Sequence, residues 1–275
     1  ADGKVILDPF MGSGTTIGEA VRIGAKAVGV DLNPVAWFMV KKALEPVDMD
    51  LLQSTFSDLR QNVSKQLLEL YSTDCAECGS SATAMYVYWA KLIRCGSCGI
   101  EIPLRKSMII ARHMSKPHTG LVSCPKCGHI YISDNIQEAQ RCRACRGKFD
   151  PKTAYCDSAG YTCPTCGAKG RILDYFRNFD EPPRHRMIGL AYLCGKCGKR
   201  YKKTDVRDLR YYDEIVARFK ERFTHLKIPR SEIPEGYNTN QMINYRYKFW
   251  YEMFNERQLI ALSELLEAIL KIEDE

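Results

Sequence analysis

Twelve of the thirteen cysteines stand in six C-x-x-C pairs, and this spacing constrains the fold more than any other feature. Two thiolates separated by two residues can bind one tetrahedral ion, and two such pairs complete its coordination. The repeated spacing favours metal over disulfides or free thiols, and the clustered cysteine run of iron–sulfur proteins is absent. The predicted zinc ligands are Cys75, Cys78, Cys95, Cys98, Cys124, Cys127, Cys142, Cys145, Cys163, Cys166, Cys194 and Cys197.

Taken in chain order, consecutive pairs predict three Cys₄ zinc ribbons. Closed Cys₄ sites leave no open coordination position, which indicates structural rather than catalytic metal. Glycine follows five of the six pairs, whereas Arg146 follows the fourth. Cys156 is the odd thiol and is predicted to be packed. Three histidines are predicted to lie on the surface or in loops: His113, His118 and His129.

Positive charge is concentrated in the cysteine-rich region. Residues 71–205 contain 22 Lys and Arg against 11 Asp and Glu, while the whole chain carries a net charge of only +7. Thiolates bound to three zinc ions lower the charge of this region to about +5. Nucleic-acid binding and simple solvation of small modules are equally good interpretations. The candidate phosphate contacts are Arg141, Arg143, Arg146, Lys148, Lys199, Arg200, Lys202 and Lys203.

The first 45 residues predict a strand–helix–strand–helix unit with parallel strands. Short apolar runs mark the strands, Thr15 and Thr16 can cap the first helix, and Pro34 suits the start of the second. Further amphipathic helices are predicted near residues 49–71 and 256–271. The expected elements of the first unit are strand 5–7, helix 15–23, strand 27–30 and helix 34–44.

A glycine-rich turn joins the first strand to the first helix, with the sequence Asp-Pro-Phe-Met-Gly-Ser-Gly-Thr-Thr at residues 8–16. Glycines let the backbone approach a ligand, and free helix-terminal N–H groups bind polar atoms. A P-loop is disfavoured because no lysine follows the second glycine, and Ile17 replaces the third glycine of the dinucleotide fingerprint. Asp31, at the end of the second strand, suits hydrogen bonding to ribose hydroxyls. An ordinary turn with a solvated aspartate is the alternative.

Residues 8–16 and 29–34 resemble two motifs of the amino-group DNA methyltransferases, which modify adenine N6 or cytosine N4. The resemblance implies the start of a Rossmann-like α/β fold that binds S-adenosylmethionine. The cofactor-binding residues that it implies are Asp8, Pro9, Phe10, Gly12, Gly14, Thr15, Thr16, Asp31, Leu32, Asn33 and Pro34.

The order of this motif, the cysteine pairs and a late helix at residues 254–262 is similar to that in zinc-ribbon-containing adenine-specific DNA methylases. This similarity implies a DNA adenine-N6 methyltransferase whose cofactor-binding and zinc-ribbon portion is this chain. The family's catalytic D-P-P-Y motif is absent, and the nearest string, at residues 180–184, is predicted to be a loop. Methyl transfer needs an acceptor for the amine hydrogens and an aromatic face for a flipped base. The catalytic residues are therefore unassigned.

Two other functions remain open: a non-catalytic zinc-ribbon module for nucleic-acid binding or assembly, and an RNA methyltransferase. On the main hypothesis the chain alone is inactive, and its partners are DNA and the remaining catalytic part, in the same or a separate polypeptide. The predicted domains are residues 1–70 for cofactor binding, 71–205 for the zinc ribbons, and 206–275 for a helical return to the methyltransferase domain. No apolar run is long enough to span a bilayer, and no leader opens the chain, which favours the cytoplasm.

Overall fold

The structure, a computed structural model, describes residues 3–178 and 180–272. The chain is mixed α/β and divides into two compact units, residues 1–58 and 59–275. The division falls inside helix α3 (Met49–Leu70), which spans the helical segment predicted near residues 49–71. The organisation inferred from the sequence, with parts at residues 1–70, 71–205 and 206–275, stays a prediction.

The first unit has the predicted element order, and its two strands are parallel. Val5 pairs with Lys26, and Asp8 pairs with Gly29. No strand or helix end differs from the sequence expectation by more than one residue, and half of the ends agree. The elements are β1 (Val5–Asp8), α1 (Thr15–Arg22), β2 (Lys26–Gly29) and α2 (Pro34–Leu44).

The two helices of this unit begin differently. Asn33 caps α2, because its side chain accepts a hydrogen bond from the Val35 N–H at 3.0 Å. The N-cap of α1 is Gly14, which has no side-chain cap, so the prediction that Thr15 and Thr16 cap this helix is wrong. The first N–H groups of α1 are therefore free of side-chain capping.

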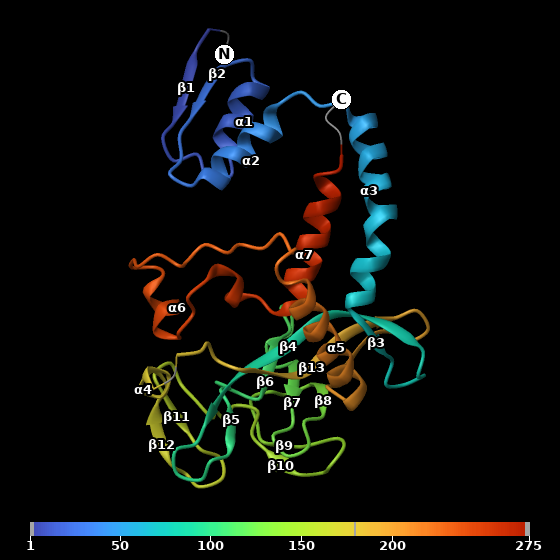
Figure 1. The fold of residues 1–275 in the computed structure, drawn as a ribbon, viewed down its shortest axis with the longest axis vertical. Coiled ribbons are helices and arrows are strands. Elements are labelled where there is room, and N and C mark those ends of the chain that lie inside the picture. The colour runs from blue at the N-terminus through green and yellow to red at the C-terminus, as the bar shows by residue number, and fades with distance from the viewer. Residues whose placement is uncertain (1–2, 179, 273–275) are drawn as a thin grey trace. The chain divides into compact units, whose positions relative to one another are not determined.

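Only one face of the two-stranded sheet is covered within its own unit. The helices α1 and α2 lie along one face (Figure 1), where Met11, Ile17 and Val40 form a small core. Parallel sheets are usually buried on both faces. The apolar side chains of the uncovered face are Val5, Leu7, Val28 and Val30, which are 47–63% exposed.

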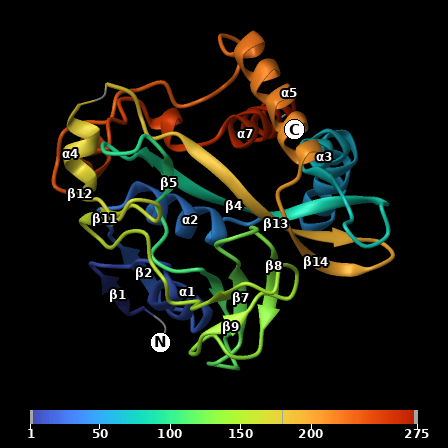
Figure 2. The ribbon, with the colours of Figure 1, turned by 90° about the horizontal axis from the view of Figure 1, so that it is seen from below.

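The second unit is built on two long antiparallel strands, β4 (Ser81–Arg94) and β13 (His185–Cys194), which lie side by side (Figure 2). The sheet order is β14-β13-β4-β3, and β5 also pairs with β4. The shorter strands are β3 (Ser72–Asp74), β5 (Glu101–Pro103) and β14 (Gly198–Lys203).

A three-stranded sheet packs close to β13. A Cβ atom on Gly189 of β13 would lie 2.0 Å from the Ile130 Cδ1 of β8, so a glycine is needed for this approach. Two small hairpins complete the cysteine-rich region. The elements are β6 (Ile109–Arg112), β7 (Gly120–Ser123), β8 (Ile130–Ser133), β9 (Gln140–Arg141), β10 (Lys148–Phe149), β11 (Gly160–Thr162) and β12 (Lys169–Arg171).

Two long helices, α5 (Val206–Arg222) and α7 (Glu256–Ile269), cover the side of β4 and β13 opposite to β6–β8 (Figures 1 and 2). Leu70, Ile215 and Ile260 form the buried core that joins them to the end of α3. No helix in the described ranges combines the length and apolarity needed to cross a bilayer. The remaining helices are α4 (Ile172–Arg177), α6 (Asn240–Asn244) and the 3₁₀ helix η1 (Trp250–Met253).

Candidate functional site

The twelve paired cysteines form three groups of four. Within each group the four Sγ atoms lie within 4.8 Å of one another, and all thirteen cysteines are free thiols. No histidine or carboxylate joins any group among the residues that the structure describes. The groups are Cys75, Cys78, Cys194 and Cys197 (site 1), Cys95, Cys98, Cys163 and Cys166 (site 2), and Cys124, Cys127, Cys142 and Cys145 (site 3).

The sulfur spacing fits a tetrahedral zinc ion. The closest Sγ–Sγ contacts between pairs are 3.6 Å in site 1 and 3.7 Å in sites 2 and 3. Zn–S bonds of about 2.3 Å imply sulfur–sulfur edges of about 3.8 Å in a tetrahedron. Each site offers four thiolates and no open position. The sites are therefore suited to hold structural zinc.

The order in which the pairs combine differs from the sequence expectation. The first pair joins the sixth, the second joins the fifth, and only the third and fourth are consecutive. Chain-order pairing was wrong for two sites because β4 and β13 are antiparallel. Cys194 at the end of β13 lies opposite Ala82 at the start of β4, beside the first pair. The sites are thus nested along the chain: the ligands of site 3 lie between those of site 2, which lie between those of site 1.

Tyr192 supports site 1 and was not identified from the sequence. Its hydroxyl accepts a hydrogen bond from the Ala76 N–H at 3.0 Å and donates toward the Cys75 Sγ at 3.7 Å. The side chain is 1% exposed, and burial raises the pKa of Tyr192 to about 12. Its position two residues before Cys194 was the only sequence signal. The tyrosine ties β13 directly to the first cysteine pair.

Backbone N–H groups turn toward sulfur at the cysteine turns. The N–H of Cys166 is the main cause that lowers the pKa of Cys163 to about 6. The five glycines that follow cysteine pairs have φ between 69° and 74°. Arg146 takes the same left-handed conformation, with φ of 59°. A residue with a Cβ is strained there.

Arg146→Gly is expected to stabilise the folded protein by about 0.5–1 kcal/mol, because glycine adopts positive φ without a Cβ clash. The measurement is urea unfolding of the zinc-loaded protein. Gly128→Ala is the matched control, since Gly128 has φ of 74° after the other pair of site 3 and should lose stability. A loss of stability in Arg146→Gly would contradict the strain assigned to this turn.

The glycine-rich turn lies at the carboxyl ends of the two parallel strands of the first unit. The Asp31 carboxylate accepts the Gly12 N–H and the Asn33 N–H, each at 2.8 Å. These two N–H groups, that of Asn33 foremost, hold the pKa of Asp31 below its usual value. The carboxylate is therefore charged at neutral pH and retains lone pairs for a further donor.

Gly14 must be glycine. Its φ is +79°, and a Cβ atom would lie 2.5 Å from the Val40 Cγ2 of α2. The backbone can thus pass directly into the uncapped start of α1. Other predicted residues surround the turn: Asp8 accepts the Phe10 N–H at 3.1 Å, and Phe10 and Leu32 are 83% and 98% exposed.

The chemistry of this turn suits a nucleoside-containing ligand. A charged carboxylate stands at the end of β2, free N–H groups stand at the start of α1, and exposed apolar side chains lie nearby. Hydrogen bonds to Asp31 join the two segments that hold the predicted cofactor residues, and binding by these residues stays a prediction: Asp8, Pro9, Phe10, Gly12, Gly14, Thr15, Thr16, Asp31, Leu32, Asn33 and Pro34.

The basic residues proposed as phosphate contacts divide into two groups. Arg141, Arg143, Arg146 and Lys148 are exposed around the second cysteine pair of site 3. Lys202 is a correction: it is 7% exposed, and its Nζ lies 2.8 Å from an Asp205 oxygen and 3.0 Å from an Asp208 oxygen. It is therefore unavailable to a phosphate.

Three further residues near the cysteine sites have contacts within the protein, as does Arg143, which pairs with Asp134 at 3.3 Å. Arg200 forms an ion pair with Glu77 at 2.8 Å, and the Lys203 Nζ donates to the Cys127 carbonyl at 3.2 Å. The Lys199 Nζ lies over the Tyr86 ring. These residues stay predictions as phosphate contacts.

Residues outside the sites follow the sequence interpretation. Cys156 is 7% exposed in the hydrophobic core around Ile93, so it is a packed thiol. Residues 180–184 form neither helix nor strand. His129 stacks on Tyr131 with ring centroids 5.4 Å apart and belongs to no sulfur group.

The segment that contains the glycine-rich turn is similar to known proteins. Residues 1–42 match the family model of the N6/N4 DNA methylases. Type II methyltransferase M.MvaI from Kocuria varians is 34% identical over 65 residues, which are 24% of this chain and 14% of that protein. Type II methyltransferase M.MjaII from Methanocaldococcus jannaschii is 33% identical over 57 residues, or 21% of this chain and 11% of that protein.

The matched segment is thus a small part of each curated relative's own length. No solved structure matches the chain significantly. Within the matched residues, the N-terminal segment is similar to DNA methyltransferases.

Proposed function

We propose that this chain is the cofactor-binding and zinc-ribbon portion of an S-adenosylmethionine-dependent DNA methyltransferase that acts on adenine N6. The main observation is the Asp31 carboxylate, which is held by the Gly12 and Asn33 N–H groups where the parallel strands end. The methylase match over residues 1–42 includes this whole arrangement.

The residues of the turn fit the parts of S-adenosylmethionine. Asp31 would accept hydrogen bonds from the ribose hydroxyls, and the uncapped N-terminus of α1 would bind the methionine carboxylate. Phe10 and Leu32 supply exposed apolar surface for the adenine. When bound, the cofactor supplies an activated methyl group on its sulfonium. The chain's own residues bind and orient the cofactor.

The uncovered face of β1 and β2 supports a further catalytic part. Val5, Leu7, Val28 and Val30 remain 47–63% exposed, although strands of a parallel sheet are usually covered on both faces. We assign this face to the rest of the methyltransferase domain, in the same or a separate polypeptide. That part would carry the D-P-P-Y motif, which this chain lacks.

The zinc ribbons are proposed to contact DNA through the exposed cations of site 3, Arg141, Arg143, Arg146 and Lys148. Lysine and arginine side chains that neutralise phosphates release counterions, so binding weakens as salt rises. These four cations lie close together in the sequence beside one closed zinc site. This clustering also favours the second candidate function, a non-catalytic nucleic-acid-binding module.

Methyl transfer tests the proposal. The full-length protein, supplied with labelled S-adenosylmethionine and duplex DNA, is expected to label DNA and to yield N6-methyladenine after digestion. RNA of the same sequence is the control substrate. N4-methylcytosine would overturn the base assignment, and label confined to RNA would favour an RNA methyltransferase. Cofactor binding without methyl transfer to either substrate would favour the second candidate function, a non-catalytic nucleic-acid-binding module.

Asp31→Ala is expected to weaken S-adenosylmethionine binding by about 10-fold or more, since a hydrogen bond to a charged group is worth about 1.5–3 kcal/mol. Calorimetry on the full-length protein measures it. Glu19→Ala is the control, because Glu19 is an exposed carboxylate of the same unit that pairs with Arg22. Equal affinity in Asp31→Ala and the unchanged protein would remove the ribose assignment.

A further inference from the structure

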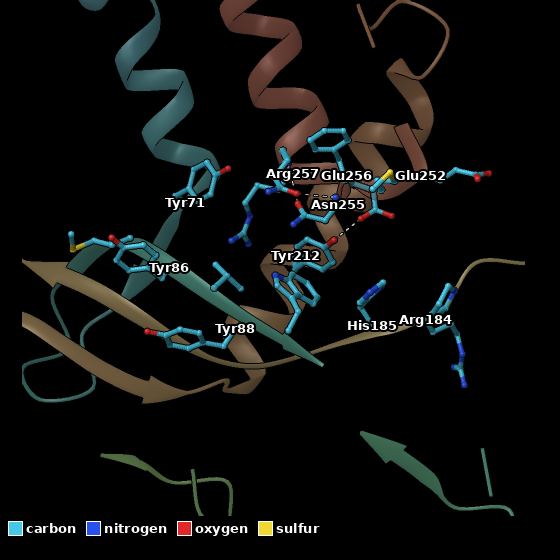
Figure 3. Close-up of a pocket in the computed structure, with 17 residues that line it drawn as sticks. Tyr71, Tyr86, Tyr88, Arg184, His185, Tyr212, Glu252, Asn255, Glu256 and Arg257 are labelled. Atoms are coloured by element: carbon cyan, nitrogen blue, oxygen red, sulfur yellow. Dashed lines mark hydrogen bonds between the residues drawn. The ribbon is translucent and has the colours of Figure 1, made fainter. Parts of the chain in front are cut away.

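A cavity of about 880 Å³ lies in the second unit beside the N-terminal end of α7 (Figure 3). Its walls come from β4, the start of β13, α5 and α7. The volume lies within the range of typical small-molecule sites. We call it the Arg257 pocket, and the lining residues used below are Tyr71, Tyr86, Trp89, Tyr212, Phe254 and Arg257.

Arg257 lines this pocket as a buried cation that lacks a hydrogen-bond partner at one nitrogen. The residue is 4% exposed, and its Nε is buried with no hydrogen-bond partner among the residues that the structure describes. The neighbouring Glu256 carboxylate is engaged by the Tyr212 hydroxyl instead. A buried N–H group without a hydrogen-bond partner is costly, so this side chain is suited to bind an anion that accepts from Nε.

Two tyrosine rings fix the orientation of the guanidinium. The Arg257 Cζ lies 5.3 Å from the ring centroid of Tyr71 and 5.3 Å from that of Tyr212. Figure 3 shows the side chain extending from α7 toward β4 between these rings. A guanidinium stacked on aromatic faces keeps its N–H edge for a planar or tetrahedral anion.

Aromatic surface lies in the same pocket. Tyr86 is 58% exposed and Phe254 is 41% exposed, while Trp89 packs against Tyr212 with ring centroids 5.0 Å apart. Nucleic-acid bases stack on such side chains in proteins that bind single strands. A phosphate-binding cation and exposed aromatic rings within one cavity match the chemistry of a nucleotide.

The pocket also borders an open edge of β4. The strand pairs with β3 through Ser81–Thr83 and with β5 through Leu92–Arg94. Between these segments, in the part of the chain that the structure describes, β4 pairs only with β13. An extended peptide would use this edge, but an edge alone does not explain a buried guanidinium. The cation favours a phosphate-bearing ligand.

We propose that the Arg257 pocket binds one nucleotide of an unpaired DNA strand, with its phosphate on Arg257 and its base on Tyr86 or Phe254. This inference rests on the proposed DNA methyltransferase function, because enzymes that modify a base take it out of the duplex stack. The pocket belongs to the second unit, whereas the cofactor turn belongs to the first.

Fluorescence anisotropy of the zinc-loaded chain with a short labelled oligodeoxythymidine tests this assignment. Tyr86→Ala or Phe254→Ala, whichever removes the ring that stacks on the base, is expected to lower affinity by about fivefold or more. Arg257→Lys is expected to lower it by about fivefold, because lysine cannot reproduce the planar donor edge. Zinc content and far-UV circular dichroism report whether each variant is folded.

The controls are Tyr237→Ala and Arg210→Lys, which change exposed residues outside the pocket and should bind as the unchanged protein does. An abasic strand should bind more weakly, and Tyr86→Ala should not weaken its binding further. Unchanged affinity in folded Tyr86→Ala and Phe254→Ala would overturn the inference. Competition by an extended peptide but not by mononucleotide would also overturn it.

The strand-binding test and the methylation test can fail independently of each other. Methylation of DNA by an enzyme whose Arg257 pocket binds no strand would remove this inference alone. Strand binding by the pocket, in a protein that transfers no methyl group to DNA, would remove the methyltransferase proposal and leave the pocket as a binding site.

Discussion

The double variant Cys95→Ser/Cys163→Ser is expected to retain about two zinc ions per chain, because both cysteines belong to site 2. Loss of one structural zinc removes about 10–16 kcal/mol of binding free energy, so the affected site should fail completely. Metal analysis of the purified protein, with thiol titration as a second readout, measures the remaining zinc.

The matched variant is Cys75→Ser/Cys95→Ser, which changes the same number of ligands. In the nested arrangement these cysteines belong to sites 1 and 2, so about one zinc ion should remain. Pairing in chain order predicts the reverse for both double variants. Two retained ions in Cys75→Ser/Cys95→Ser, with one in Cys95→Ser/Cys163→Ser, would therefore contradict the nested sites.

Lys202→Met is expected to destabilise the protein by about 3–5 kcal/mol, because it removes the cation of a buried ion pair. The Asp208 side chain is 5% exposed and would lose the Lys202 ammonium group that lies 3.0 Å from it. Among the described residues, the donors left to the Asp208 carboxylate would be the Thr73 hydroxyl at 2.6 Å and the Asp205 N–H at 3.1 Å. Urea unfolding followed by far-UV circular dichroism measures the loss.

Lys199→Met, on the same strand β14, is the control. Lys199 is exposed and has no carboxylate partner among the described residues, so its loss should change stability by less than about 0.5 kcal/mol. DNA binding should weaken more in Lys199→Met than in any folded Lys202 variant. Equal, small effects of both substitutions on unfolding would show that the Lys202 ion pairs contribute little.

Local patterns predicted the first unit well. The parallel order of β1 and β2, the start of α2 at Pro34 and the position of α7 each follow from signals within a few residues. The turn residues likewise lie together because the carboxyl ends of neighbouring parallel strands meet at one edge of a sheet. The N-cap of α1 was mispredicted because Gly14, which has no side chain to accept a hydrogen bond, precedes the first helical residue.

Long-range pairing could not be predicted from the same signals. The nesting of the zinc sites depends on the register of β13 against β4, in which Cys194 lies opposite Ala82. Lys202 looked like one cation in a basic cluster, but the capping residues of α5 surround it. Arg257 gave no signal as a ligand-binding residue, because its pocket forms only when α7 packs near α5 and β4.

The assignment of the glycine-rich turn to S-adenosylmethionine is the central claim, and chemical-shift mapping of backbone amides tests it most directly. Titration of the labelled chain with the cofactor is expected to shift the amides of residues 8–16 and 31–34, even when binding is weak. Adenosine alone should shift the second segment more than the first. Shifts confined to other residues, or none at millimolar cofactor, would contradict the assignment.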